Sequence, residues 1–189
     1  MPIIVDAPRE DWAAQGLALA ARLLHDLAPH AAAVEHIGST SIPGMPAKPI
    51  LDLQVSVADL DAPLDAPLQA LGLSRMPFER DHVPAGLTDD PARWTKRMWS
   101  GPGINLHVRR TGSPNERLAL LFRDWFRAHP AAVPAYGAFK SALADALSGI
   151  PDDLGIYSDV KDPVVDLVIV AAEEWAAATG WSAHNTHQP

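Results

Sequence analysis

The segment from Glu35 to Val57 constrains the fold of this chain most strongly, because two short apolar runs in it flank a Gly/Ser turn and a Pro/Gly loop. In the second run, Ile50 to Val57, apolar and polar side chains alternate as they do in a β-strand. One face carries Leu51, Leu53, Val55 and Val57, and the other carries Asp52, Gln54 and Ser56. The pattern predicts two adjacent strands, with an acid on the polar face that lies in a cleft or in water.

The turn Gly38-Ser39-Thr40 follows the first of these two strands. Glycine allows unusual backbone angles and close approach, so such a turn can offer backbone N–H groups to an anion. Lys48 lies in the following loop, and Asp52 lies in the next strand. This combination predicts a phosphate site with a metal ion. An ordinary turn beside a solvated aspartate explains the same pattern, and the residues alone leave both interpretations open.

A family resemblance adds weight to the first interpretation. The stretch GSTSIPGMPAKPILDLQV resembles the signature of the GrpB family, a group of small bacterial proteins whose fold resembles the nucleotidyltransferase superfamily. Further matches are Ile104 to Val108, Gly112-Ser113-Pro114, Leu121 to Asp124, the pair Tyr136 and Lys140, and the pair Tyr157 and Lys161. The similarity extends over roughly residues 5 to 175. It implies an α/β (α+β) fold, a mixed twisted β-sheet flanked by helices, with a helical C-terminal part.

The resemblance also implies a nucleotidyltransferase-like protein that binds a nucleotide or phospho-metabolite and transfers a nucleotidyl or phosphoryl group. Asp52 and His107 are the expected catalytic residues, and Asp52 with Gln54 would hold a divalent metal ion, Mg²⁺ or Mn²⁺. The residues expected to bind the phosphate or nucleotide are Gly38, Ser39, Thr40, Lys48, Arg109 and Lys161. The turn, Asp52 and His107 are expected on one open face of the sheet.

One departure from the superfamily pattern favours a different class of function. Gln54 stands where the resemblance calls for a second carboxylate, and a neutral amide cannot offset the charge of Mg²⁺. The alternative is a non-catalytic nucleotide or phospho-metabolite binding module. Some family members are fused to dephospho-coenzyme A kinase, which suggests a link to coenzyme A metabolism.

Four other positions also have a structural and a functional interpretation. Along Ile104 to Arg110, the side chains of Asn105, His107 and Arg109 share one face, so His107 can act near neutral pH or simply pair with a carboxylate. His36 and the pair Arg123-Asp124 are most simply structural. Lys161 lies four residues after Tyr157, so the two share a helix face if the last helix begins early enough.

Composition limits the function classes. The chain has 189 residues, 48% of them hydrophobic, a net charge of −8 and no cysteine. Such a chain can bury one sizeable core, expected over residues 1–181, with a disordered tail over residues 182–189. The acidic charge argues against long nucleic acid as a partner, and no apolar run is long enough for a membrane span. A small-molecule partner and a cytoplasmic location are expected; the oligomeric state is left open.

Hydrophobic periodicity and turn residues predict the order of the elements. Helices are expected at Glu10–Leu27, Asp59–Leu71, Asn115–His129 and Ala132–Leu147, and from about Ser158, with Pro163 in the first turn, to Gly180. Strands are expected at Val34–Ile37, Ile50–Val57, Leu73–Phe78, Trp94–Ser100 and Ile104–Arg110. The polar segment Glu79 to Arg93 is expected to be a loop that could fold over the site.

Overall fold

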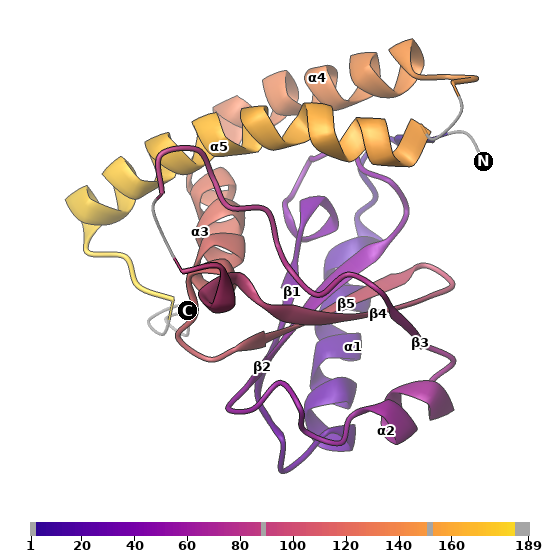
Figure 1. The fold of residues 1–189 in the computed structure, drawn as a ribbon. Helices are drawn as coiled ribbons and strands as arrows, with labels where there is room; N and C mark the ends of the chain where they lie inside the picture. The colour runs from indigo at the N-terminus through magenta and orange to yellow at the C-terminus, as the bar shows by residue number, and fades with distance from the viewer. Residues whose placement is uncertain (1–2, 88–89, 151–152, 184–189) are drawn as a thin grey trace.

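A computed structural model describes residues 3–87, 90–150 and 153–183 of the chain (Figure 1). Residues 184–189, most of the tail predicted to be disordered, lie outside the described residues. The helices are α1 (Asp11–Asp26), α2 (Asp65–Ala70), α3 (Pro114–Ala128), α4 (Val133–Ala146) and α5 (Asp153–Thr179). The strands are β1 (Ala31–Ile37), β2 (Leu51–Val57), β3 (Ser74–Met76), β4 (Lys96–Gly101) and β5 (Ile104–Arg110), and the 3-10 turns are η1 (Ser39–Ser41), η2 (Pro91–Trp94) and η3 (Pro130–Ala132).

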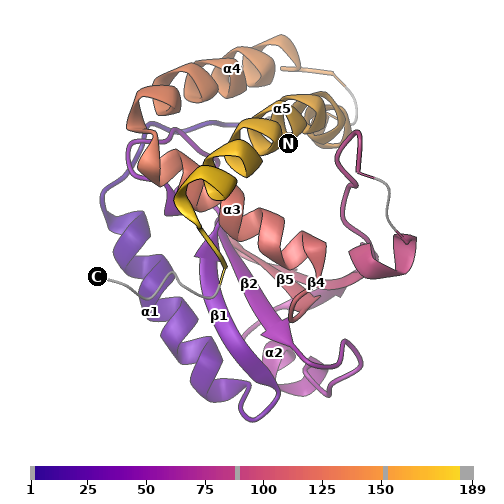
Figure 2. The ribbon, with the colours of Figure 1, turned by 90° about the vertical axis from the view of Figure 1, so that its left-hand side faces the viewer.

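The five strands form one mixed sheet in the order β1-β2-β5-β4-β3. Only β2 and β5 run parallel, while the other neighbours are antiparallel. Helices α1 and α2 cover one face of the sheet, and α3, α4 and α5 lie on the other side (Figures 1 and 2). The predicted α+β class, with a mixed sheet flanked by helices, is confirmed.

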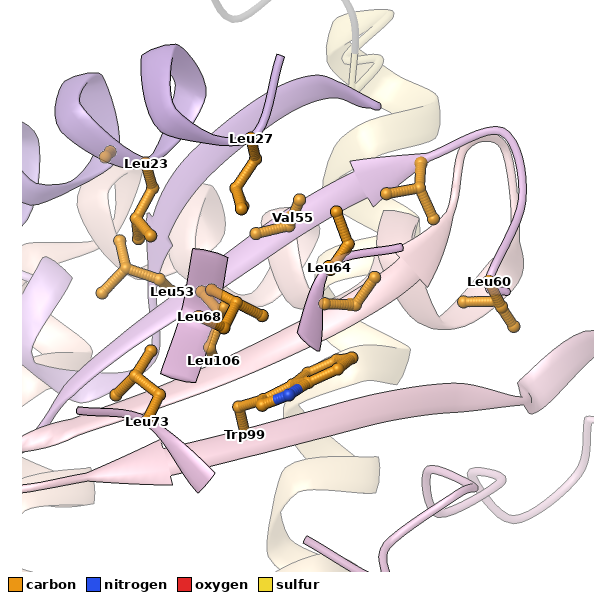
Figure 3. Packing of buried hydrophobic residues seen from close by; sticks show 13 residues of the cluster. Leu23, Leu27, Leu53, Val55, Leu60, Leu64, Leu68, Leu73, Trp99 and Leu106 are labelled. Carbon is orange, nitrogen blue, oxygen red and sulfur yellow. The ribbon is translucent and has the colours of Figure 1, made fainter. Parts of the chain in front are cut away.

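The face of the sheet covered by α1 and α2 carries the main apolar core (Figure 3). Leu53 and Val55 of β2 pack there with Leu23 of α1, Leu68 of α2 and Leu106 of β5. Each of these side chains is fully buried. Burying one leucine in this way stabilises the fold by about 1.5–3 kcal/mol. The apolar side chains that alternate along β2 therefore contribute to the folding free energy by being buried on this face.

The opposite face of β2 is closed over Gln54 and Ser56, and only its Asp52 end lines a cavity. Gln54 is fully buried, and Ser56 is only 3% exposed. Helix α3 covers both, because the Gln54 amide donates to the Glu116 carbonyl at 3.3 Å and the Ser56 hydroxyl donates to the Glu116 carboxylate. The polar side chains of this strand are therefore satisfied by protein groups, as buried polar groups must be.

The last helix begins earlier than predicted, at Asp153, and it includes Pro163 well inside the helix. Proline removes one backbone hydrogen bond and usually ends a helix. Here Val165 and Ile169, just after the proline, pack in a core cluster with Leu121 of α3. That packing favours continuation of the helix through Pro163. The early start also places Tyr157 and Lys161 on one helix face.

The remaining boundaries differ from prediction by a few residues, except that α2 and β3 are shorter than expected. Within the described ranges, no helix combines the length and apolar character needed to cross a membrane.

Candidate functional site

The turn after β1 is a rigid structure clamped by α3. Gly38 has φ 69° and ψ −171°, and its carbonyl accepts a 2.6 Å hydrogen bond from the Ser41 hydroxyl. Arg127 donates to the Ser41 carbonyl at 2.8 Å, and Arg123 donates to the His36 carbonyl at 3.1 Å. Both ends of the turn are thus fixed by arginines from one helix, which keeps Ser39 in a defined position.

His36 contacts this turn through the Thr40 hydroxyl. Its Nε2 lies 3.0 Å from the Thr40 hydroxyl, which itself donates to the Ile50 carbonyl at 3.2 Å. Since the hydroxyl proton is used on Ile50, His36 is the donor and carries its proton on Nε2. Burial and the charge of Arg127 lower the pKa of His36 to about 4, so the ring is neutral. His36 has the structural role that the sequence suggested, and the Thr40 hydroxyl is occupied within the protein.

Asp52 lies beside the turn on the polar face of β2. Its Oδ1 accepts a 3.1 Å hydrogen bond from the Asn105 amide and lies 3.8 Å from Nε2 of His107. Burial alone would raise the pKa of Asp52, but hydrogen bonding from His107 and Asn105 and the charge of Lys161 lower it overall. The carboxylate is therefore ionised at neutral pH.

Lys140 is a site residue that the sequence prediction did not include. Its side chain is 3% exposed, and its ammonium group donates to the Ser39 hydroxyl at 2.8 Å and to the Pro46 carbonyl at 2.5 Å. Among the residues that the structure describes, no carboxylate lies within salt-bridge distance of it. Burial, and then the charge of Lys161, lower its pKa to about 7. Only the resemblance pair Tyr136 and Lys140 pointed to this position in the sequence.

A cavity of about 320 Å³ opens between the turn and α5. We call it the lysine chamber, because Lys48, Lys140 and Lys161 reach it from three separate segments. Its other polar or turn residues include Gly38, Ser39, Thr40, Asp52, Asn105, His107 and Tyr157. All the predicted site residues except Gln54 and Arg109 therefore line this one chamber.

A second cavity, of about 260 Å³, adjoins the first and shares Ser39, Asp52 and Lys161 with it. We call it the apolar chamber. The name refers to the side chains that distinguish it from the lysine chamber, Trp94, Leu118, Phe122, Val165 and Ile169. The polar side chains of Asp81, Arg109 and Asn115 line it as well, so the predicted site residue Arg109 reaches this second cavity. His82 and Pro84 of the segment after β3 also line it, so the predicted loop does reach the site. Asp166 of α5 holds that segment, through His82 at 3.0 Å and the Ala85 backbone N–H at 2.9 Å.

Gln54 and Arg109 belong to a buried network outside the lysine chamber. Arg109 donates to the Gln54 amide oxygen at 2.6 Å and to Asp81 at 2.8 Å. Lys96 donates to Asp81 at 2.6 Å, and Asn115 donates to it at 2.9 Å. Burial opposes ionisation of Asp81, but the adjacent Arg109 and Lys96 outweigh it and hold the Asp81 pKa far below its usual range.

This network bears on the predicted metal ion. The amide oxygen of Gln54 already accepts a strong hydrogen bond from Arg109, whereas Asp52 is ionised beside the turn. In the described part of the chain, no group of three or more His, Cys, Asp or Glu side chains is arranged to hold a metal. A Mg²⁺ ion often uses one or two carboxylates together with substrate phosphates. Asp52 fits that role only if the bound molecule supplies the remaining oxygen ligands.

A family model and a crystal structure both relate this chain to GrpB proteins. The model of the family described as "GrpB protein" matches residues 2–170. The crystal structure of the conserved protein GrpB from Enterococcus faecalis is similar to this fold, with a TM-score of 0.72 and 30% sequence identity, over 91% of this chain and 99% of that one.

Curated relatives carry two kinds of name. A protein of Mycolicibacterium paratuberculosis named "Dephospho-CoA kinase" is 34% identical over 95% of this chain and 48% of its own length. The Bacillus subtilis "UPF0157 protein YqkA" is 31% identical over 78% of this chain and 40% of its own length. The chain thus spans about half the length of the curated relatives named as kinases.

Proposed function

The chain belongs to the GrpB family, and from that premise we propose that it binds a phosphate-bearing small molecule, a nucleotide or a phospho-metabolite, in the lysine chamber. The observation that carries the proposal is the Lys140 side chain, buried against Ser39 with no carboxylate within salt-bridge distance among the described residues.

The physical argument is one of uncompensated charge. A buried ammonium without an anionic partner is strongly unfavourable, and such groups are normally paired or neutral. Lys48 and Lys161 bring two more cationic side chains to the same cavity. A bound phosphate would supply the missing negative charge, with the Ser39 hydroxyl and the turn at Gly38 as further contacts. Charge-assisted hydrogen bonds of this kind are shorter and about twice as strong as neutral ones.

Nucleotidyl transfer is a second candidate, favoured by the ionised Asp52 beside the turn. In that reaction an acceptor hydroxyl attacks the α-phosphorus, the bond to the bridging oxygen breaks, and pyrophosphate leaves with the bonding electrons. Burial lowers the pKa of His107, so the ring would be neutral. Its Nδ1 lies 3.5 Å from the Lys96 nitrogen and its Nε2 lies 3.8 Å from Asp52, so His107 could take the hydroxyl proton only by giving up one of these contacts. A divalent ion held by Asp52 and the phosphates, with Gln54 as the proposed second ligand, would offset charge. The bond from Arg109 to Gln54 weighs against that ligand pair, and we favour binding over transfer.

The names of the relatives suggest which ligands to test first. Because proteins named "Dephospho-CoA kinase" match about half of their length to this chain, ATP, dephospho-coenzyme A and coenzyme A are reasonable first ligands. All three carry phosphate groups and an adenine base. The apolar chamber, which adjoins the lysine chamber at Ser39, would then receive the organic part of the ligand.

The test is a thermal-unfolding screen with these ligands and the four nucleoside triphosphates, with and without Mg²⁺ or Mn²⁺. A ligand at about 100 times its Kd should stabilise the folded state by roughly 2.7 kcal/mol. Ser39→Ala should weaken binding modestly, whereas the matched change Ser74→Ala, at an exposed position of β3, should not. Absence of a shift with every ligand at millimolar concentration would overturn the proposed function.

A further inference from the structure

Lys140 is surrounded by groups from every element that packs around the lysine chamber. Ser39 and Pro46 are its hydrogen-bond partners, and its ammonium nitrogen lies 5.3 Å from the centre of the Tyr136 ring on its own helix. The charged and titratable groups facing the same cavity are Lys48 from the loop, Asp52 and His107 from the sheet, and Tyr157 and Lys161 from α5.

The two hydrogen bonds of Lys140 can be made by a neutral amine as well as by an ammonium group, because neither acceptor is charged. An ammonium group has three N–H donors, whereas a neutral amine has two. The structure gives Lys140 two acceptors, the Ser39 hydroxyl and the Pro46 carbonyl, and both are uncharged. The neighbouring charges of Lys161 and Lys48 disfavour a third positive charge, whereas Asp52 favours it and opposes them in part. These contacts agree with a pKa that burial and Lys161 lower to about 7.

We propose that Lys140 selects ligands with a terminal, dianionic phosphoryl group, and that such a ligand enters the lysine chamber together with one proton. This inference rests on the proposed function, because it concerns the same chamber. A phosphoryl dianion beside the Lys140 nitrogen favours the ammonium form and accepts a charge-assisted hydrogen bond from it. A phosphodiester has a single negative charge spread over two free oxygens, so it favours protonation of Lys140 less.

The proposal has a quantitative consequence at pH 8. With a pKa of about 7, Lys140 is about nine-tenths neutral there, so its protonation on binding takes up nearly one proton per ligand. The second phosphate pKa is about 6, so a terminal phosphoryl group is already dianionic at this pH and supplies no proton itself. The affinity should therefore fall by up to about tenfold for each pH unit above 7, as linkage requires.

The experiment is calorimetric titration at pH 8, with a chelator present, in two buffers whose protonation enthalpies differ widely. The probes are adenosine monophosphate and adenosine diphosphate, and cyclic adenosine 3′,5′-monophosphate is the matched diester. The slope of the apparent enthalpy against the buffer enthalpy gives the number of protons taken up. We expect nearly one proton with each terminal phosphate, and at least tenfold weaker binding of the diester.

Three variants identify the side chain that takes up the proton when the ligand binds. Lys140→Met, which has no titratable group, and Lys140→Arg, which is always charged, should both reduce the uptake to near zero. His25→Gln removes an exposed histidine of α1 that lines neither chamber, and it should leave the uptake unchanged. Circular dichroism of each variant checks that it is folded, and the two substitutions at Lys140 give independent results if one of them disturbs packing.

The outcomes separate this inference from the proposed function. Tight binding without proton uptake, uptake that persists in Lys140→Met, or equal affinity for the cyclic diester would overturn the inference and leave the phosphate site intact. Failure of both adenosine phosphates to bind would also overturn it. The proposed function itself falls only if the whole ligand panel fails in the thermal screen.

Discussion

Asp52 lies so close to Gly38 that a Cβ atom on the glycine would be 2.6 Å from its nearest carboxylate oxygen. Real Cβ atoms do not approach another atom this closely. Gly38 also has a positive φ with ψ near 180°, a region that is essentially restricted to glycine. The turn and the carboxylate therefore fix each other's positions, and the residue before Ser39 has no acceptable substitute.

Gly38→Ala should displace Asp52 and weaken phosphate binding at least roughly tenfold, as expected when a group beside a ligand moves by about an ångström. The matched control is Gly44→Ala, because Gly44 also has a positive φ but its added Cβ would meet its nearest atom, of Val133, only at 4.0 Å. Gly44→Ala should lose about 1–2 kcal/mol of stability from backbone strain. Gly38→Ala should lose more, because its added Cβ also clashes with Asp52. The measurement is ligand titration with chemical denaturation, and equal binding by the two variants would contradict the prediction.

Lys140→Met should make the unliganded protein more stable at pH 7 and remove part of its pH dependence. The folded-state pKa of about 7 is below the ordinary value of 10.5, so the unfolded state binds more protons between these values. The stability of the wild type should therefore rise with pH above 7, by about 5 kcal/mol if the full interval is covered. Urea denaturation between pH 6 and 9.5 measures the free energy of unfolding as a function of pH. We expect this curve to be flatter for Lys140→Met than for wild type. Parallel profiles would contradict the lowered pKa.

Asp81→Asn should destabilise the fold by roughly 3–5 kcal/mol, because it leaves Lys96 and Arg109 buried without their carboxylate. The control is Asp61→Asn, which breaks an exposed pair with Arg97 and should change stability by less than about 1 kcal/mol. Because the folded protein holds the Asp81 pKa below its ordinary value, the ionised carboxylate stabilises the fold at neutral pH. This stabilisation should be lost as the pH falls from the ordinary carboxyl range toward the lowered pKa. Comparable losses in the two variants would show that the network around Asp81 is not structural.

Asp52→Asn should weaken Mn²⁺ binding in the presence of adenosine diphosphate by at least roughly tenfold. The reason is that Asp52 is the ionised carboxylate that lines both chambers at their junction with the turn. Titration of Mn²⁺ with the nucleotide present measures the effect, and Asp59→Asn, at an exposed carboxylate, serves as the control. If wild type and Asp52→Asn bind the ion equally, Asp52 is a structural acid and the metal is held elsewhere.

Local patterns were sufficient to predict most of the elements. The alternation in β2 and β5 depends on neighbouring residues, so both strands and the turn before Asp52 could be read directly. The extent of α5 could not, because Pro163 opposes a helix locally and only packing of Val165 and Ile169 against α3 overrides it. A sequence window contains no information about that distant packing.

The composition of the site was harder to predict for the same reason. The polar face of β2 is open only at Asp52, because α3 covers Gln54 and Ser56 through Glu116, which is 60 residues away from Ser56. Lys140 meets Ser39 across 101 residues, and no spacing rule connects them. Asp81 lies in the polar segment that was expected to fold over the site, but the sequence did not indicate its partners Arg109, Lys96 and Asn115. Each omission concerns a side chain that reaches the site from another part of the chain.

The lysine chamber has a further consequence for biosynthesis. Its turn and carboxylate are made early, at residues 38 to 52, but its last two lysines are at 140 and 161. A ribosome-bound chain that has folded only its sheet thus lacks Lys140 and Lys161. If the chamber binds the proposed phosphate ligand, stabilisation by that ligand would begin only after α5 has been made and has docked, because α5 carries Lys161.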